Sequence, residues 1–161
     1  MLYKEDLLVN KGNFKGAFFI ICFRISNAIQ SKGKFFRYLG FPFRAFYKIC
    51  FRWLLGTDIP DTTKIGKGCA VYHGHSLIIH DDCIIGDYFT VRHNTTIGQA
   101  RKGGGAPIIG DYVEVGANAV IIGDIHIGSY SIIAAGAVVI KDVPEKVIVA
   151  GNPARVVKVL E

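Results

Sequence analysis

The sequence predicts an all-β domain built as a parallel β-helix, preceded by a short α-helical segment. The main observation is that every sixth residue from 109 to 139 is aliphatic: Ile109, Val115, Ile121, Ile127, Ile133 and Val139. A helix would repeat at about 3.6 residues and an ordinary strand at about 2, so neither explains this step. It is typical of a β-helix in which about three hexads form one coil and the aliphatic side chains point inward. Each coil can bury these side chains only against its neighbours, so the coils must stack.

The preceding part of the chain carries the same step with two interruptions. Residues 65, 71 and 77 are aliphatic and six apart, and so are residues 79, 85, 91 and 97. The two-residue offset between Leu77 and Ile79 predicts a small bulge at residues 74–76. The second interruption, residues 99–107 (QARKGGGAP), predicts a flexible glycine-rich loop that leaves the coil. Loops that extend from a rigid scaffold often carry function.

Charge and composition place a boundary near Gly56. Residues 1–56 contain ten Lys and Arg and two acidic residues, whereas residues 57–161 contain nine and eleven, which accounts for the net charge of +6. We therefore expect a basic, aromatic helical segment at 1–56. A β-helix domain at 57–161 would include the protruding loop 99–107 and a C-terminal tail. The four cysteines form no CxxC pair, and no secretory cleavage site follows the first apolar run. Both observations favour reduced thiols in a cytoplasmic protein.

Two short helices are expected in the N-terminal segment, at residues 14–30 and 42–55, because glycine and proline punctuate the chain between them. In the second helix, three cations recur four residues apart and form one basic stripe, which consists of Arg44, Lys48 and Arg52. Residues 14–55 would then either lie on the inner face of a membrane, basic side toward anionic head groups, or pack on the β-helix or another subunit. No nucleic-acid motif is present, which argues against nucleic acid as a partner.

Three features together resemble the hexapeptide-repeat acyltransferases: the hexads, the loop that ends at Pro107, and the closing run at 141–157 (KDVPEKVIVAGNPARVV). Within that superfamily the chain is similar to the serine acetyltransferases and the capsular-polysaccharide O-acetyltransferases, over roughly residues 57–158. The resemblance implies a left-handed parallel β-helix that assembles as a homotrimer. It also implies that acetyl-CoA binds as co-substrate in grooves between subunits.

A histidine is the expected general base, because an alcohol is a poor nucleophile until its proton is removed. His73 stands where the resemblance places the catalytic histidine, and Asp58 lies fifteen residues before it, as in serine acetyltransferases. That separation is close to one coil, so the Asp58 carboxylate is expected to orient the His73 imidazole. The alternative is that Asp58 caps a turn and His73 is an ordinary rim residue. His93 follows His73 by twenty residues, one coil plus the bulge, so it should stack on His73 as a helper.

The remaining site candidates come from the bulge, the loop and the resemblance. Tyr72, His75 and Arg101 are the acceptor-binding candidates. The resemblance places the pantetheine arm along small residues on successive coils and the CoA phosphates near basic residues of the loop and tail. The matching cofactor-binding candidates are Gly98, Lys102, Ala117, Ala135, Lys141 and Arg155. The alternative for the small residues is that β-helix corners favour Gly and Ala in any case.

Two departures from the serine acetyltransferase pattern favour a saccharide acceptor. Gly105 and Ala106 precede Pro107 where those enzymes have Arg-His, and Tyr72 replaces an aspartate. Partners for the charged groups of free serine are therefore missing. We expect an O-acetyltransferase that acts on a saccharide or sugar precursor in surface glycan biosynthesis, without a metal, since neither a C-x₂-C nor an H-x₃-H pair occurs. A serine O-acetyltransferase of cysteine biosynthesis and a non-catalytic or metal-binding β-helix protein stay open as alternatives.

Overall fold

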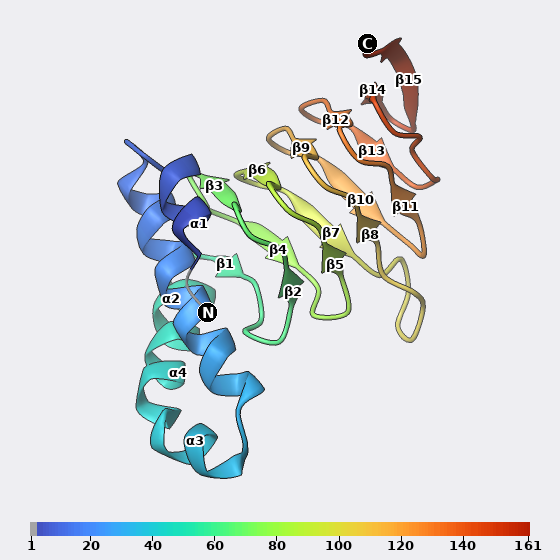
Figure 1. Cartoon of the computed structure of the whole chain (residues 1–161). Helices are drawn as coiled ribbons and strands as arrows, with labels where there is room; N and C mark the ends of the chain where they lie inside the picture. Colours follow the sequence, from blue (N-terminus) through green and yellow to red (C-terminus); the bar gives the residue numbers. More distant parts are fainter. Residues whose placement is uncertain (1–2) are drawn as a thin grey trace.

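The computed structural model describes residues 3–161 and consists of a helical segment followed by a parallel β-helix (Figure 1). The helices pack beside the first coil, and α3 lies at the end of the segment that is furthest from the β-helix. They are α1 (Lys4–Val9), α2 (Phe14–Ser31), α3 (Lys34–Leu39), α4 (Phe41–Tyr47) and the π-helix η1 (Lys48–Leu54).

Three sheets form the walls of the β-helix, and consecutive strands pass from one sheet to the next. The first sheet contains β1 (Thr57–Asp58), β4 (Leu77–Ile79), β7 (Thr96–Gly98), β10 (Val120–Ile122) and β13 (Val138–Val139). The second contains β2 (Lys64–Ile65), β5 (Ile84–Ile85), β8 (Ile108–Ile109) and β11 (His126–Ile127). The third contains β3 (Ala70–Tyr72), β6 (Thr90–Arg92), β9 (Glu114–Val115), β12 (Ile132–Ile133), β14 (Val147–Gly151) and β15 (Ala154–Val159). All pairs are parallel except β14 with β15, which confirms the predicted fold class.

The predicted inward positions form the core, because every aliphatic residue on the six-residue step is buried. Strand register also reproduces the predicted interruptions. Val71 pairs with Val91, Val91 with Val115, and Val115 with Ile133, so the successive coils advance by 20, 24 and 18 residues. The uninterrupted coil has eighteen residues, the bulge adds two, and the loop between β7 and β8 adds six. Within the bulge, His73 has a φ of 66°, which turns the chain sharply out of β3.

The cysteines behave as the composition predicted. Cys22, Cys69 and Cys83 are buried, Cys50 is half-buried, and none of the four forms a disulfide in the described part of the chain. Burial raises the pKa of the Cys69 thiol to about 12 and that of Cys83 to about 11. These two thiols therefore stay protonated at neutral pH and act as small apolar core residues.

The N-terminal helices close the edge of the first coil, which no preceding coil covers. The Asn10 side chain donates to the carbonyl of Cys69 at 2.8 Å, and Asn13 donates to the carbonyl of Val71 at 2.8 Å. An open strand edge leaves backbone groups unpaired, and side chains from the helices pair them here. The helical segment is thus part of the structure that terminates the β-helix.

A buried ion pair anchors this cap. The Asp6 carboxylate and the Arg24 guanidinium lie 2.9 Å apart, and their side chains are 0% and 4% exposed. Arg24 also donates to the carbonyl of Ile65 at 2.6 Å and to that of Gly66 beside β2. Asp6 accepts from the backbone N–H of Cys69 at 3.0 Å. Every polar atom of the pair therefore has a partner, as a buried charge requires.

The basic stripe predicted on the second helix faces the β-helix. Arg44 pairs with Asp61 at 2.7 Å, and Arg52 pairs with Asp58. Burial raises the pKa of the Asp61 carboxyl, but hydrogen bonds from Arg44 and Ser26 outweigh it and lower that pKa overall. The expectation that this stripe faces anionic head groups is wrong for both arginines, because carboxylates of the first coil take them up. The alternative, packing on the β-helix, is confirmed for this face.

The helix boundaries in this region differ from those expected. The first helix, α2, matches its prediction to within one residue. The helix expected over 42–55 is present as an unbroken helical run over 41–54, but it changes from the α-helix α4 to the π-helix η1 at Lys48. Residues 34–39, expected as part of a connection, form α3. Tertiary packing decides here, since Tyr47 and Phe51 insert between α2 and the first coil and are almost fully buried.

Candidate active site

One corner of the β-helix, at the carboxyl end of the third sheet, aligns four of the predicted site residues. The paired inward residues of β3, β6, β9 and β12 are Val71, Val91, Val115 and Ile133. The residues two positions further along the chain from each therefore form a single column, which consists of His73, His93, Ala117 and Ala135. Backbone hydrogen bonds support the alignment: the N–H of Asn118 donates to the carbonyl of His93 at 3.1 Å, and that of Gly136 donates to Ala117 at 2.9 Å. We call this set the corner column.

The two histidines of the corner column contact each other. Their ring centroids lie 5.6 Å apart and the rings meet edge to face, at 83°. The predicted stacking of His93 on His73 is therefore present. His73 is exposed, whereas His93 is half-buried, and its Nδ1 is buried without a hydrogen-bond partner among residues 3–161. A buried ring nitrogen without a partner is costly and is common where a ligand supplies the partner.

Asp58 does not join this pair. Its carboxylate accepts from the Nε of Arg52, and no hydrogen bond links it to His73 in the described chain. In β1, Thr57 is buried and points inward, so Asp58 points outward, beside Ile78 of the next coil. There it lines a groove with Lys48 and Arg52. By register Asp58 lies one coil from Ile78, five residues past His73, and the neighbouring guanidinium of Arg52 takes its carboxylate.

A pocket of about 180 Å³ lies beside His73, between α2, η1 and the bulge. Its apolar wall consists of Phe14, Phe18, Phe19, Phe51, Leu55 and Val71. His73 and the acceptor-binding candidate His75 both line it. Among the described lining residues, Lys15 is the single charged side chain and there is no carboxylate. These aromatic residues were not among the predicted site residues. The spacing of the phenylalanines in α2 indicates only that one face of this helix is apolar and packs against another part of the structure.

The other two acceptor-binding candidates lie elsewhere. Tyr72 ends β3, and the guanidinium carbon of Arg92 sits 5.5 Å from the centre of its ring. Arg101 is exposed in the loop that Figure 1 shows projecting between β7 and β8, and its carbonyl accepts from Gly104 in a turn. Neither residue is among those that line the pocket beside His73.

The cofactor-binding candidates fall into three places. Ala117 and Ala135 belong to the corner column. Gly98 ends β7 in the first sheet, outside that column, and a Cβ added to it would lie 3.2 Å from the Cβ of His80. Lys102 is exposed in the loop.

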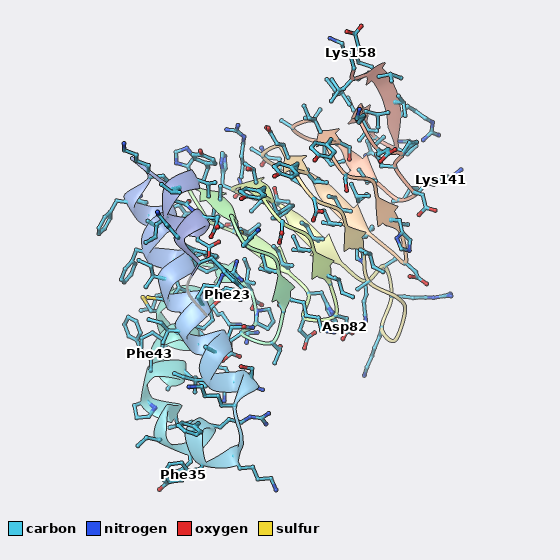
Figure 2. All side chains as sticks on the ribbon, in the orientation of Figure 1. Phe23, Phe35, Phe43, Asp82, Lys141 and Lys158 are labelled. Atoms are coloured by element: carbon cyan, nitrogen blue, oxygen red, sulfur yellow. The ribbon has the colours of Figure 1, made fainter. Side chains whose placement is uncertain are left out.

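Lys141 and Arg155 come together at the far end of the β-helix, although fourteen residues separate them in the chain. Both line one pocket of about 320 Å³ between the end of β13 and the β14–β15 hairpin. Figure 2 shows Lys141 at the outer edge of the last coil. The structure thus provides two cations at one site, as binding of the CoA phosphates would need.

One group of potential metal ligands lies outside these sites. Ligand atoms of His80, Asp81 and Asp82 are within 4.8 Å of one another on the turn after β4. The two aspartates are exposed, and Asp82 accepts from the Gln99 amide at 3.0 Å. None of the three was a predicted site residue, and exposed carboxylates of this kind are ordinary surface features.

Comparisons with known proteins show which family the chain resembles. The family pattern described as bacterial transferase hexapeptide (six repeats) matches residues 106–141. The putative colanic acid biosynthesis acetyltransferase WcaB of Escherichia coli K12 is 32% identical over 156 residues, which cover 94% of this chain and 96% of that protein. Serine acetyltransferase 4 of Arabidopsis thaliana is 33% identical over 147 residues, 90% of this chain and 40% of that protein.

Solved structures show the same likeness. The soybean serine acetyltransferase apoenzyme has a TM-score of 0.80 at 31% identity, and the match covers 95% of this chain and 66% of that one. A serine acetyltransferase of Brucella abortus in complex with coenzyme A has a TM-score of 0.82 at 26% identity, and the match covers 98% of this chain and 67% of that one. The chain thus spans about two thirds of these enzymes. Because WcaB is 32% identical over almost the whole of both chains and the hexapeptide pattern matches residues 106–141, the chain belongs to the hexapeptide-repeat acyltransferase family.

Proposed function

We propose that the protein transfers an acetyl group from acetyl-CoA to a hydroxyl of a saccharide or sugar precursor in surface glycan biosynthesis. The observation that carries this proposal is the contact of His93 with His73, which lines an apolar, aromatic pocket. The similarity to WcaB, a putative colanic acid biosynthesis acetyltransferase, supports the glycan part of the proposal.

The chemistry follows from the exposed position of His73. Its imidazole takes the proton of the acceptor hydroxyl as the oxygen attacks the thioester carbonyl. The same proton then passes to the sulfur as the carbon–sulfur bond breaks, so His73 returns to its neutral form. His93 is one coil further along, and its ring N–H can donate to the oxygen that becomes negative during the attack. Asp58 is proposed as a positioning residue that acts through Arg52 and the turn beside it.

The pocket beside His73 suits a sugar better than free serine. Aromatic side chains offer flat apolar faces to the C–H side of a sugar ring, while hydroxyls stay available for His73 and His75. Free serine carries a carboxylate and an ammonium, and both need partners once they leave water. Lys15 could pair with the carboxylate, but the described pocket lining holds no acidic group for the ammonium.

Acetyl-CoA would extend from the His73 pocket along the corner column. The small side chains of Ala117 and Ala135 leave the backbone there open to the pantetheine amides, and Lys141 with Arg155 would hold phosphates at the far end. We propose that the chain forms a homotrimer, as the family resemblance implies. In it, Gly98 and Lys102, which lie outside the column, would come to the groove from a neighbouring subunit.

Removing the two cations at the far end should weaken acetyl-CoA binding without slowing the chemical step. Lys141→Ala and Arg155→Ala are each expected to raise KM for acetyl-CoA about tenfold at unchanged kcat, since a hydrogen bond to a charged group contributes about 1.5–3 kcal/mol. Lys158→Ala is the matched control, because Lys158 is also exposed on β15 but does not line this pocket. Equal KM values for all three variants would exclude this phosphate site.

An acceptor screen tests the function itself. Purified protein is incubated with acetyl-CoA and, separately, with nucleotide sugars, oligosaccharides of surface glycans and L-serine, and release of the CoA thiol is followed. We expect turnover with a saccharide acceptor and little with serine. The second candidate, a serine O-acetyltransferase, is favoured by the similar serine acetyltransferase structures, which include the soybean enzyme in complex with serine. Brisk transfer to serine and none to any saccharide would establish that candidate instead.

A further inference from the structure

The helical segment ends in an exposed apolar tip, residues 31–41, which contains α3. Its large side chains are turned to solvent: Phe35 is 72% exposed, Tyr38 84% and Leu39 67%. Phe36 and Phe41 are exposed as well. Figure 2 shows Phe35 at the end of the molecule opposite the β14–β15 hairpin. A concentration of exposed aromatic residues of this kind usually marks an interaction surface.

The same tip carries positive charge that forms no ion pair with a carboxylate of residues 3–161. Lys32, Lys34 and Arg37 are all exposed, and the sequence contains no acidic residue between Asp6 and Asp58. Arg37 donates its Nε–H to the backbone carbonyls of Gln30 and Lys32, which fixes its position but leaves its charge unneutralised. Arg24, Arg44 and Arg52 differ from these three cations, because carboxylates of the cap and first coil pair with them.

We infer that the tip docks on an anionic lipid bilayer. Aromatic rings prefer the boundary between lipid tails and head groups, and lysine and arginine beside them attract anionic head groups. None of the helices in residues 3–161 has both the length and the apolar character to cross a membrane, so this contact is peripheral. The inference is independent of which acceptor the enzyme uses.

Charge favours a lipid surface over a second copy of the chain on this tip. A symmetric contact would bring two identical sets of Lys32, Lys34 and Arg37 together with no carboxylate between them. Like charges facing each other across an interface oppose association. An anionic bilayer instead supplies the negative charge that the tip lacks, and it accepts the exposed rings at the same time.

Sedimentation with lipid vesicles tests this inference. The full-length protein is expected to bind vesicles of phosphatidylcholine that contain phosphatidylglycerol, and to bind pure phosphatidylcholine vesicles much more weakly. Each basic residue near an anionic surface strengthens binding about fivefold, so the triple variant Lys32→Gln, Lys34→Gln, Arg37→Gln should bind about a hundredfold more weakly. Phe35→Ser with Tyr38→Ser should also weaken binding at constant charge.

The control variant removes the same charge elsewhere. The control is a triple variant at three exposed positions of the β-helix: Lys64→Gln, Lys146→Gln and Lys158→Gln. It should bind vesicles within about threefold of the parent. Circular dichroism verifies that each variant is folded. Equal loss in the control and tip variants would show that net charge alone is responsible, and would overturn the inference. A tip variant that binds vesicles as well as the parent does would also overturn the inference. A tip variant whose only measured change is a smaller oligomer, detected by light scattering, would overturn it as well.

Discussion

Replacing His73 with alanine is expected to lower kcat/KM for acetyl transfer by about 10²–10⁴, because the acceptor hydroxyl loses its general base. His73 is exposed at a turn and has no inward packing role, so the fold and the oligomer should persist. The rate of CoA release, measured with the acceptor found in the screen, gives the effect on transfer. Circular dichroism and light scattering monitor structure. Activity within a few-fold of the parent would remove His73 from the mechanism.

The neighbours of His73 separate catalysis from positioning. His93→Ala should reduce kcat by about 10–100-fold if its N–H stabilises developing charge, and His93→Gln, which keeps a donor, should recover part of that loss. Asp58→Asn should lower kcat and change the pH profile if the carboxylate positions His73. If the Arg52 pair is its sole function, Asp58→Asn and Arg52→Met should produce equal, small losses of stability with unchanged kcat.

Arg24→Met is expected to destabilise the protein by about 3–5 kcal/mol, the cost of leaving one partner of a buried ion pair uncompensated. The Asp6 carboxylate would remain buried without its cation, and the carbonyls of Ile65 and Gly66 would lose their donor. The cap would then separate from the first coil. Urea denaturation followed by circular dichroism measures the change in the free energy of unfolding.

Arg37→Met is the matched control for this experiment. Arg37 lies in the same helical segment but is exposed and contacts only backbone carbonyls, so its loss should change stability by no more than about 0.5 kcal/mol. A change below about 1 kcal/mol for Arg24→Met would mean that the helices contribute little to the stability of the β-helix.

The sequence by itself determined the β-helix and the stacking of His93 on His73. Stacked coils repeat along one axis, so the position of a residue follows from counting along the chain once the step and its interruptions are known. That is why the buried aliphatic rows could be predicted, and why the interval from His73 to His93 predicted their contact. The same counting could not show which way a side chain turns. Asp58 was expected beside His73, but its one-coil partner is Ile78 and its carboxylate bonds to Arg52.

Only the tertiary structure decided how the helical segment is used. Asn10, Asn13 and Arg24 bond to strand edges some forty to sixty residues further along the chain, and no local pattern reports such contacts. The pocket beside His73 and the division between buried and exposed aromatic residues depend on the same packing. Local periodicity records which residues repeat, whereas the pairing of charges and the exposure of a helix face depend on which distant surface comes to lie against it.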